Sequence, residues 1–379
     1  MFDQIVLDPS SGAPLYRQLA VTITELIHSK VIAPGYRLPP TRELAGQLGL
    51  NRTTVSAAYS LLEEQGLVRG HVGRGSFVTE PSPMISGAVN WDAILPRHDR
   101  SETGSLQSVE IPFATSRPAD GAFPLVQFRR LAREVIDGPE TRDILQLGSP
   151  LGYGPLRKYL FDRALEEGVA RAGDDLIITN GCQQALDLLT RLLAASGQRV
   201  IIEDPVYHGL LRVIQRAGAN IIPAPVGESG VDPDELESLF LRYQPRACVL
   251  TPSFQNPTGA TINAANRGRI VEAANRHGVV LIENDIYTDL RYQGTRLATL
   301  KQTDAGGNVI LLRSYSKIAF PGLRVGWVIA PRPVISCLAE AKQTTDLHSD
   351  QLAQAVLLRF AESGELDKHL ERTRRDGVQ

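Results

Sequence analysis

The sequence predicts two unlike domains, a small helical domain that ends in a β-hairpin and a larger α/β domain. Residues 14–67 carry apolar side chains at helical spacing, and a strand–glycine–strand pattern follows them. Beyond residue 110, strand-like apolar runs alternate with helical stretches, which favours a mostly parallel sheet flanked by helices. We assign residues 1–80 to the first domain, 81–110 to a linker and 111–379 to the second domain.

Composition excludes several classes of protein. The formal charge of −2 gives no global field for nucleic acid or membranes, so any DNA binding needs a local basic patch. The three cysteines show no CxxC spacing, which favours a reducing cytoplasm and predicts neither disulfides nor a metal site. The start "MFDQIVLDPSSG" has no signal-peptide pattern, and no apolar run approaches the roughly 20 residues of a membrane span. We expect a cytoplasmic protein with no membrane partner.

The first domain reads as three helices and a hairpin. "PLYRQLAVTITELIHSKVI" carries an apolar stripe that ends before Pro34. "TRELAGQLGLNRTTVSAAYSLLEEQGLV" predicts two helices around Gly49, with Thr41 as the N-cap of one and Asn51 as the N-cap of the other. "LVRGHVGRGSFV" then predicts two short strands joined by a glycine turn.

This arrangement suits a winged helix-turn-helix, in which the second helix of the turn enters the major groove of double-stranded DNA. Arginines and hydroxyls are the groups that reach phosphates and base edges. The exposed candidates are Arg42, Arg52, Thr53, Thr54, Ser56 and, at the wing tip, Arg74. The pattern alone also permits a three-helix protein-interaction domain with a solvated charged face.

The segment "LPPTRELAGQLGLNRTTVSAAYSLLEEQGLVRGHVGRGSFV" resembles the DNA-binding domain of GntR-type bacterial repressors over its whole length. The resemblance implies DNA contacts by Arg42, Arg52, Thr53 and Thr54, and by the wing glycine Gly73. Some family members carry an arginine at the position of Ser56.

In the second domain, two stretches offer groups for an anion and a reactive amine. "IITNGCQQALDLL" predicts a strand, a glycine turn and a helix whose first N–H groups, at Gly181, Cys182 and Gln183, form an anion cradle. "SYSKIAFPGLRVGW" places Lys317 near the cation of Arg324, which favours a deprotonated amine. The guanidinium of Arg324 also suits a phosphate, and Ser314 and Ser316 can add hydroxyl donors to that phosphate. Taken alone, Lys317 also suits a surface lysine beside a turn.

Three further stretches offer groups for a flat ring. "EDPVYHG" contains Tyr207, which either stacks on a ring or packs in the core. "TPSFQNPTGA" places Asn256 in a turn where its amide can hold a ring hydroxyl. "LIENDIYTDLRY" ends an apolar strand with Asn284, Asp285 and Tyr287, and a buried carboxylate there requires a positive partner.

In this order, "NGCQQAL", "DPVYHG", "NPTG", "ENDIY" and "SYSKIAFPGLRVGW" resemble the pyridoxal 5'-phosphate site of class I/II aminotransferases, over residues 111–375. The resemblance implies that Lys317 is the Schiff-base lysine, that Tyr207 stacks on the ring, and that Asn256 and Tyr287 bond its phenolic oxygen. It implies that the phosphate is held by Gly181, Cys182, Gln183, Ser314 and Arg324. A GntR-like domain joined to such a domain resembles the MocR subfamily of bacterial transcription regulators.

Departures from the family pattern concern the ring-nitrogen partner, the C-terminal end and Leu147, which stands where relatives often have a tyrosine. The family aspartate that faces the pyridine nitrogen stands three residues before the tyrosine, which is Asn284 here, whereas Asp285 stands two residues before it; the partner stays open between them. Family members also continue beyond "HLERTRRDGVQ", so we expect an incomplete C-terminal subdomain.

We therefore expect a homodimeric, pyridoxal-phosphate-dependent transcription regulator that senses the cofactor or a small amine or amino-acid effector. Its transaminase turnover should be slow or absent. The alternatives are an active aminotransferase that carries a DNA-binding domain, and a repressor whose α/β half is only a dimerisation scaffold.

Overall fold

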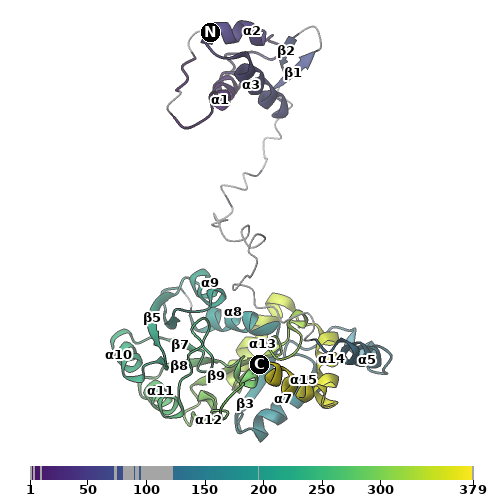
Figure 1. Ribbon diagram of the computed structural model, residues 1–379, viewed down its shortest axis with the longest axis vertical. Helices are drawn as coiled ribbons and strands as arrows, with labels where there is room; N and C mark the ends of the chain where they lie inside the picture. Colours follow the sequence, from purple (N-terminus) through teal and green to yellow (C-terminus); the bar gives the residue numbers. More distant parts are fainter. Residues whose placement is uncertain are drawn as a thin grey trace. The chain divides into compact units, whose positions relative to one another are not determined.

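The computed structural model describes residues 2, 5–8, 11–71, 75–79, 89, 94, 123–194 and 196–377 (Figure 1). The chain divides into two units, Met1–Ala114 and Thr115–Gln379. The predicted wing residues Gly73 and Arg74 lie outside the described residues, as does most of the predicted linker. Among the helices that the structure describes, none has the length and apolar character to cross a bilayer.

The first unit consists of three helices and an antiparallel hairpin, as the sequence predicts. Its elements are α1 (Leu15–His28), α2 (Thr41–Leu48), α3 (Arg52–Glu64), β1 (Val68–His71) and β2 (Gly75–Val78). The predicted apolar stripes of the three helices meet in one core, where each of the following side chains is at most 6% exposed: Leu19, Ile23, Leu44, Ala45, Val55, Ala58 and Leu62. This packing fixes α3 relative to α2.

The turn between α2 and α3 is held by backbone conformation and one cap. Gly49 ends α2 in the left-handed region, with φ 63°. Asn51 caps α3 as predicted, because its Oδ1 accepts hydrogen bonds from the backbone N and the Oγ1 of Thr53, both at 3.0 Å. The prediction for Thr41 was wrong: Thr41 is the first residue of α2, and Pro40 before it makes no side-chain cap. Pro40 instead leads the chain into the helix with a fixed φ of −53°.

The second unit contains an eight-stranded sheet in the order β3-β10-β9-β8-β7-β4-β5-β6. All neighbours are parallel except β10, which is antiparallel to both β3 and β9, and β6 at the far edge. The strands are β3 (Asp174–Thr179), β4 (Arg199–Asp204), β5 (Asn220–Gly227), β6 (Gly230–Val231), β7 (Ala247–Leu250), β8 (Val280–Asn284), β9 (Val309–Ser314) and β10 (Gly326–Pro331).

Helices cover both faces of this sheet, as the alternating pattern predicts (Figure 1). One face packs against α8 (Gly181–Leu193), α9 (His208–Arg216) and α13 (Arg332–Asp346). The other packs against α7 (Gly154–Glu166), α10 (Pro233–Tyr243), α11 (Ala264–His277), α14 (Gln351–Glu362) and α15 (Glu365–Asp376). The remaining helices are α5 (Leu125–Ile136), α6 (Thr141–Ile144) and α12 (Leu300–Thr303), with 3₁₀ turns η5 (Thr288–Leu290) and η6 (Pro321–Leu323).

The sheet topology gathers the predicted motifs at one edge. Because β3, β4, β7, β8 and β9 run in the same direction, their carboxyl ends lie along the same edge of the sheet. The five loops that leave these ends carry the five predicted stretches, and β10 starts from that edge as well. Gly181 follows β3 as the first residue of α8, and the other four loops contain Tyr207, Asn256, Tyr287 and Lys317.

Candidate functional site

The N-terminus of α8 is built around a glycine that no other residue can replace without strain. Gly181, the first residue of α8, has φ +75°, and a Cβ placed on it would lie 2.4 Å from Nη2 of Arg324. A Cβ on Gly326 would lie 2.9 Å from the Cα of Gly181. These contacts bring the free N–H groups of α8 next to the guanidinium of Arg324.

Two serine hydroxyls adjoin this guanidinium. Arg324 Nη1 donates to Ser316 Oγ at 3.2 Å, and Nη2 donates to the carbonyl of Asn180 at 3.4 Å. Ser314 is buried; its Oγ lies 2.9 Å from Ser316 Oγ and 3.1 Å from the carbonyl of Val325. The Ser314 hydroxyl is therefore held by protein groups, whereas Ser316 sits directly beside Arg324. Helix N–H groups, a guanidinium and a hydroxyl are the groups that bind phosphates in proteins.

Lys317 lies in the turn after β9, within the same loop as Ser316 and Arg324. Burial lowers the pKa of its ammonium, and the positive charge of Arg324 lowers it further. A lower pKa increases the neutral fraction of the amine, which is the form that attacks a carbonyl carbon. The predicted reactive lysine therefore lies beside the predicted phosphate cradle.

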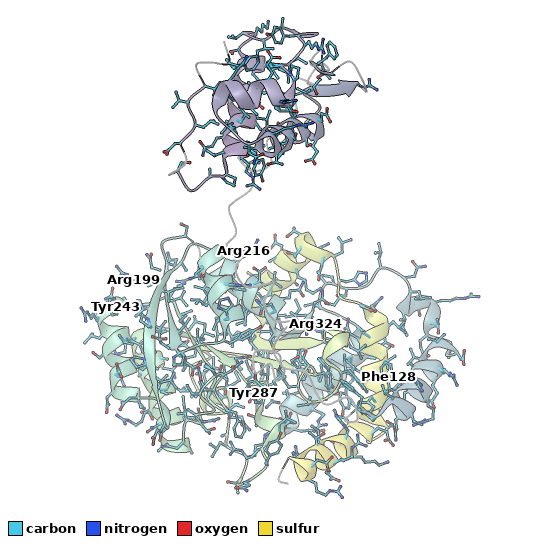
Figure 2. The ribbon with its side chains drawn as sticks, turned by 45° about the horizontal axis from the view of Figure 1, so that its top comes forward. Phe128, Arg199, Arg216, Tyr243, Tyr287 and Arg324 are labelled. Atoms are coloured by element: carbon cyan, nitrogen blue, oxygen red, sulfur yellow. The ribbon has the colours of Figure 1, made fainter. Side chains whose placement is uncertain are left out.

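Tyr287 and Asn256 meet across the loops that follow β8 and β7, since Asn256 Nδ2 donates to Tyr287 Oη at 3.4 Å. Burial raises the pKa of the Tyr287 hydroxyl, so it stays protonated. Tyr287 and Arg324, both labelled in Figure 2, belong to the larger unit. Tyr207 precedes α9 and is 46% exposed, and its ring covers Gly209. An exposed aromatic face at this edge is available for stacking on a flat ring.

The two candidate partners of a pyridine nitrogen have different environments. Asp285 is buried and forms an ion pair with Arg313 Nε at 3.1 Å, and it also accepts a hydrogen bond from the Thr288 hydroxyl. Asn284 Nδ2 donates to Thr251 Oγ1 at 3.5 Å. The Oδ1 of Asn284 is buried and has no hydrogen-bond partner among the described residues. Asp285 is thus engaged by protein groups, whereas Asn284 keeps one polar atom for a ligand.

No prediction from the sequence covers a buried carboxylate that lies in β4, two strands away from Asn284. Glu203, in β4, accepts hydrogen bonds from the backbone N of Thr251 at 3.0 Å and from Gln255 Nε2 at 3.4 Å. Burial raises the pKa of Glu203 to about 7. The only signal in the sequence was a glutamate inside the apolar run "RVIIED".

A second group of residues missed from the sequence supports the start of α8. Asp346, at the end of α13, accepts hydrogen bonds from Asn180 Nδ2 at 2.8 Å and Gln184 Nε2 at 2.6 Å. Its other oxygen pairs with Lys342 Nζ at 2.9 Å. Gln183 Nε2 donates to the carbonyl of Gly209, and the thiol of Cys182 lies 3.4 Å from the carbonyl of Arg313. The side chains of the first turn of α8 are therefore tied to the protein.

In the first unit, the predicted DNA-facing residues lie at the start of α2 and α3. Arg42, Arg52 and Thr53 are exposed, and Thr54 and Ser56 are partly buried. The hydroxyl of Thr53 donates to the capping oxygen of Asn51, so Thr53 helps to fix the start of α3.

Comparison with known proteins agrees with the division of the chain into two units. Residues 111–376 match the family model of aminotransferase class I and II, and residues 15–78 match that of bacterial regulatory proteins of the gntR family. The HTH-type transcriptional regulator YdcR of Escherichia coli is 29% identical over 371 residues, covering 95% of this chain and 78% of YdcR.

Two further comparisons concern a relative of the whole chain and a solved structure similar to the second unit. The probable rhizopine catabolism regulatory protein MocR of Rhizobium meliloti is 29% identical over 385 residues, covering 98% of this chain and 76% of MocR. A crystal structure of the multiple substrate aminotransferase from Thermococcus profundus has a TM-score of 0.71 and 29% identity, covering 76% of this chain and 75% of that one.

A winged helix-turn-helix joined to an aminotransferase fold in the same chain defines a class of transcription regulators. The chain belongs to the aminotransferase class I and II family through residues 111–376, and with its gntR-family domain it is a GntR/MocR-type transcriptional regulator. The resemblances drawn from the sequence are confirmed at this level.

The crowding at Gly181 leads to a stability prediction. We expect Gly181→Ala to lower the free energy of unfolding by about 1–3 kcal/mol, because alanine is strained at φ +75° and its Cβ displaces Arg324. Gly322→Ala is the matched control, since a Cβ there meets no atom within 4 Å and Gly322 has no left-handed φ. Urea denaturation of both variants measures the difference, and equal midpoints would contradict the role of Gly181.

Proposed function

We propose that the chain is a transcription regulator that binds pyridoxal 5'-phosphate at the carboxyl edge of its sheet and double-stranded DNA through its N-terminal domain. The observation that carries this proposal is the meeting of Gly181, Arg324 and Lys317 in one cradle. It combines an anion site with an amine whose pKa is lowered, which suits a phosphate-bearing aldehyde. The proposed domains are residues 1–80 and 111–379, joined by the linker 81–110.

Each side chain of the site has a proposed task. The N–H groups of Gly181, Cys182 and Gln183 bind phosphate with Arg324 and Ser316, while Ser314 positions Ser316. Lys317 would supply the amine for the aldehyde carbon, with loss of water. Tyr207 covers one face of the ring, and Asn256 and Tyr287 hold its phenolic oxygen. When bound, the cofactor supplies a carbonyl for amines and an electron-withdrawing ring.

We propose that a small amine or amino-acid effector would replace the Lys317 amine on the same carbon, which would release Lys317. Release of Lys317 would change the β9–β10 loop that also carries Arg324, and thereby the equilibrium between conformations of a homodimer. Two subunits present two DNA-binding domains, which suits an operator with two half-sites. Function at an operator places the protein in the cytoplasm.

The second candidate is an active aminotransferase with an attached DNA-binding domain. Its support is the similarity of the second unit to a solved aminotransferase at 29% identity. Against efficient turnover stands the environment of the proposed ring nitrogen, where Asn284 offers a neutral amide and the carboxylate of Asp285 is paired with Arg313. A neutral partner withdraws electrons from the ring less effectively than a carboxylate partner does.

The role of Lys317 can be tested by absorption spectroscopy. We expect pyridoxal phosphate to give the wild-type chain a near-visible band, and borohydride to fix the cofactor on the peptide that contains Lys317. Lys317→Ala should lose the band, because no amine remains to bond the aldehyde. Lys158→Ala, at a lysine whose side chain is 76% exposed, serves as the control. An unchanged band in Lys317→Ala would show that another amine holds the cofactor.

DNA reading by α3 can be tested with a duplex selected from random sequence by the wild-type full-length chain. We expect Arg52→Ala to weaken binding of this duplex by about 1–3 kcal/mol and to relax the base preference at one position. Arg142→Ala, which removes an exposed arginine of the second unit, should leave affinity unchanged. If none of the substitutions Arg42→Ala, Arg52→Ala and Thr53→Ala changes the affinity for this duplex, the assignment of the DNA interface is wrong.

Turnover separates the two candidate functions. With amino donors and pyruvate or 2-oxoglutarate, we expect multiple-turnover rates below about 1 s⁻¹, because the neutral amide of Asn284 weakens the stabilisation of negative charge on the substrate carbon. Spectral change on addition of amines should still occur, since Lys317 and the cradle do not depend on Asn284. Rates of about 1–10³ s⁻¹ would favour the aminotransferase instead.

A further inference from the structure

One buried glutamine side chain joins two of the loops at the carboxyl edge of the sheet. Gln255, which is 2% exposed, lies in the loop after β7 and directly precedes Asn256. Its Nε2 donates to the carbonyl oxygen of Pro205 at 2.7 Å. Pro205 lies in the loop after β4, two residues before Tyr207, and β4 is the sheet neighbour of β7. A single amide therefore connects the loop of the proposed ring-stacking tyrosine to the loop of Asn256.

The same amide closes the turn that carries Asn256. Gln255 Oε1 accepts hydrogen bonds from the backbone N of Thr258 at 3.0 Å and from the Thr258 hydroxyl at 2.7 Å. The backbone N of Gln255 donates to the carbonyl oxygen of Ala260 at 2.9 Å. Asn256, whose Nδ2 donates to Tyr287 Oη, thus lies in a short turn that Gln255 holds from within.

Backbone groups fix the direction of this amide. The carbonyl of Pro205 can only accept a hydrogen bond and the backbone N of Thr258 can only donate one, so a reversed amide would oppose like groups. Nε2 also donates, at 3.4 Å, to Oε2 of the buried Glu203. Both protons and both lone pairs of the Gln255 amide are therefore used. Loss of this side chain would leave buried polar groups of both loops unpaired.

We propose that Gln255 is a positioning residue that holds Tyr207 and Asn256 at the separation that one cofactor ring requires. The inference rests on the proposed binding of pyridoxal phosphate, in which Tyr207 covers a face of the ring and Asn256 bonds its phenolic oxygen. These two side chains reach the same small ligand from different strands. A connection that exists before the cofactor arrives reduces the cost of ordering both loops on binding.

Amide hydrogen exchange of the full-length chain without cofactor measures this connection, because each loop holds a hydrogen-bonded N–H group. The N–H of Leu210 bonds to the carbonyl of Tyr207 at 3.0 Å, and the N–H of Thr258 bonds to Gln255 Oε1. Exchange at Thr258 reports on the turn that contains Gln255. Exchange at Leu210 reports on the loop that Gln255 reaches only through the carbonyl of Pro205 and through Glu203.

Gln255→Glu keeps nearly the same shape, but an ionised carboxylate cannot donate to the carbonyl of Pro205. We expect exchange to become about 10-fold faster at Leu210 as well as at Thr258, the size expected for a lost buried hydrogen bond. Gln255→Ala should have the same effect without an added charge, so it decides the question if Gln255→Glu does not fold.

Cofactor affinity tests the consequence for the site. Titration with pyridoxal phosphate, followed by the near-visible band, should show about 10-fold weaker binding in both Gln255 variants. The double variant Glu203→Gln/Gln255→Glu removes the repulsion between two neighbouring carboxylates but leaves the carbonyl of Pro205 without its donor. We expect the double variant to bind the cofactor as weakly as Gln255→Glu does.

Gln354→Glu is the matched control for a buried charge. Gln354 is fully buried in α14, donates to the carbonyls of Ser349 and Asp350, and accepts from the backbone N of Tyr153. This variant should leave exchange at Leu210 and the affinity for pyridoxal phosphate unchanged.

Four results would overturn the inference and leave the proposed function standing. They are unchanged exchange at Leu210 in both Gln255 variants, unchanged cofactor affinity in both, recovery of affinity in the double variant, and equal changes in Gln354→Glu. A wild-type chain that binds no pyridoxal phosphate overturns the proposed function and, with it, the role of Gln255 at the cofactor. The exchange measurement without cofactor then still decides whether Gln255 connects the two loops.

Discussion

The site depends on one steric constraint, the close approach of Gly181 to Arg324 and to Gly326. Here the first turn of α8 and the start of β10 occupy space that admits no Cβ, so the N-terminus of a helix lies against a guanidinium. Two like-signed groups are brought together by backbone packing, and an anion between them relieves their repulsion. The loop that carries Lys317 joins β9 to β10, so the position of the amine follows from the same contact.

Much of the fold was predictable because it depends on local pattern. The stripes in α1, α2 and α3 and the alternation of strands and helices follow side-chain periodicity, which adjacent residues determine. The order of strands was not predictable in this way, since the antiparallel insertion of β10 between β3 and β9 depends on pairing between distant segments. The misplaced cap at Thr41 has a local cause: Pro40 already sets the entry into α2, and a side-chain cap is not needed there.

The candidate site was predictable only in part. Its five loops follow from the motifs and the parallel topology, but the spacing of Asn284 and Asp285 relative to Tyr287 permitted either as the ring partner. The two residues lie in different environments: Asp285 pairs with Arg313, and Asn284 hydrogen-bonds to Thr251. Glu203 contacts Thr251 across 48 positions of sequence, and Asp346 contacts Asn180 across 166. Such partners leave no periodic signal, because only the folded sheet brings them together.

The charges around the proposed site suit the retention of an anion. Asp285 and Glu167 are paired with Arg313, and Asp346 is paired with Lys342, so these carboxylates contribute little net negative field. The groups that face the cradle, Lys317 and Arg324, are cations or neutral donors, which favours retention of a phosphate. Under the proposed function, a strong anion site next to a neutral amide partner would hold a cofactor while providing little stabilisation for a carbanion. We infer that this combination favours a ligand-bound state that persists, which is the property a transcription regulator requires and a fast aminotransferase must avoid.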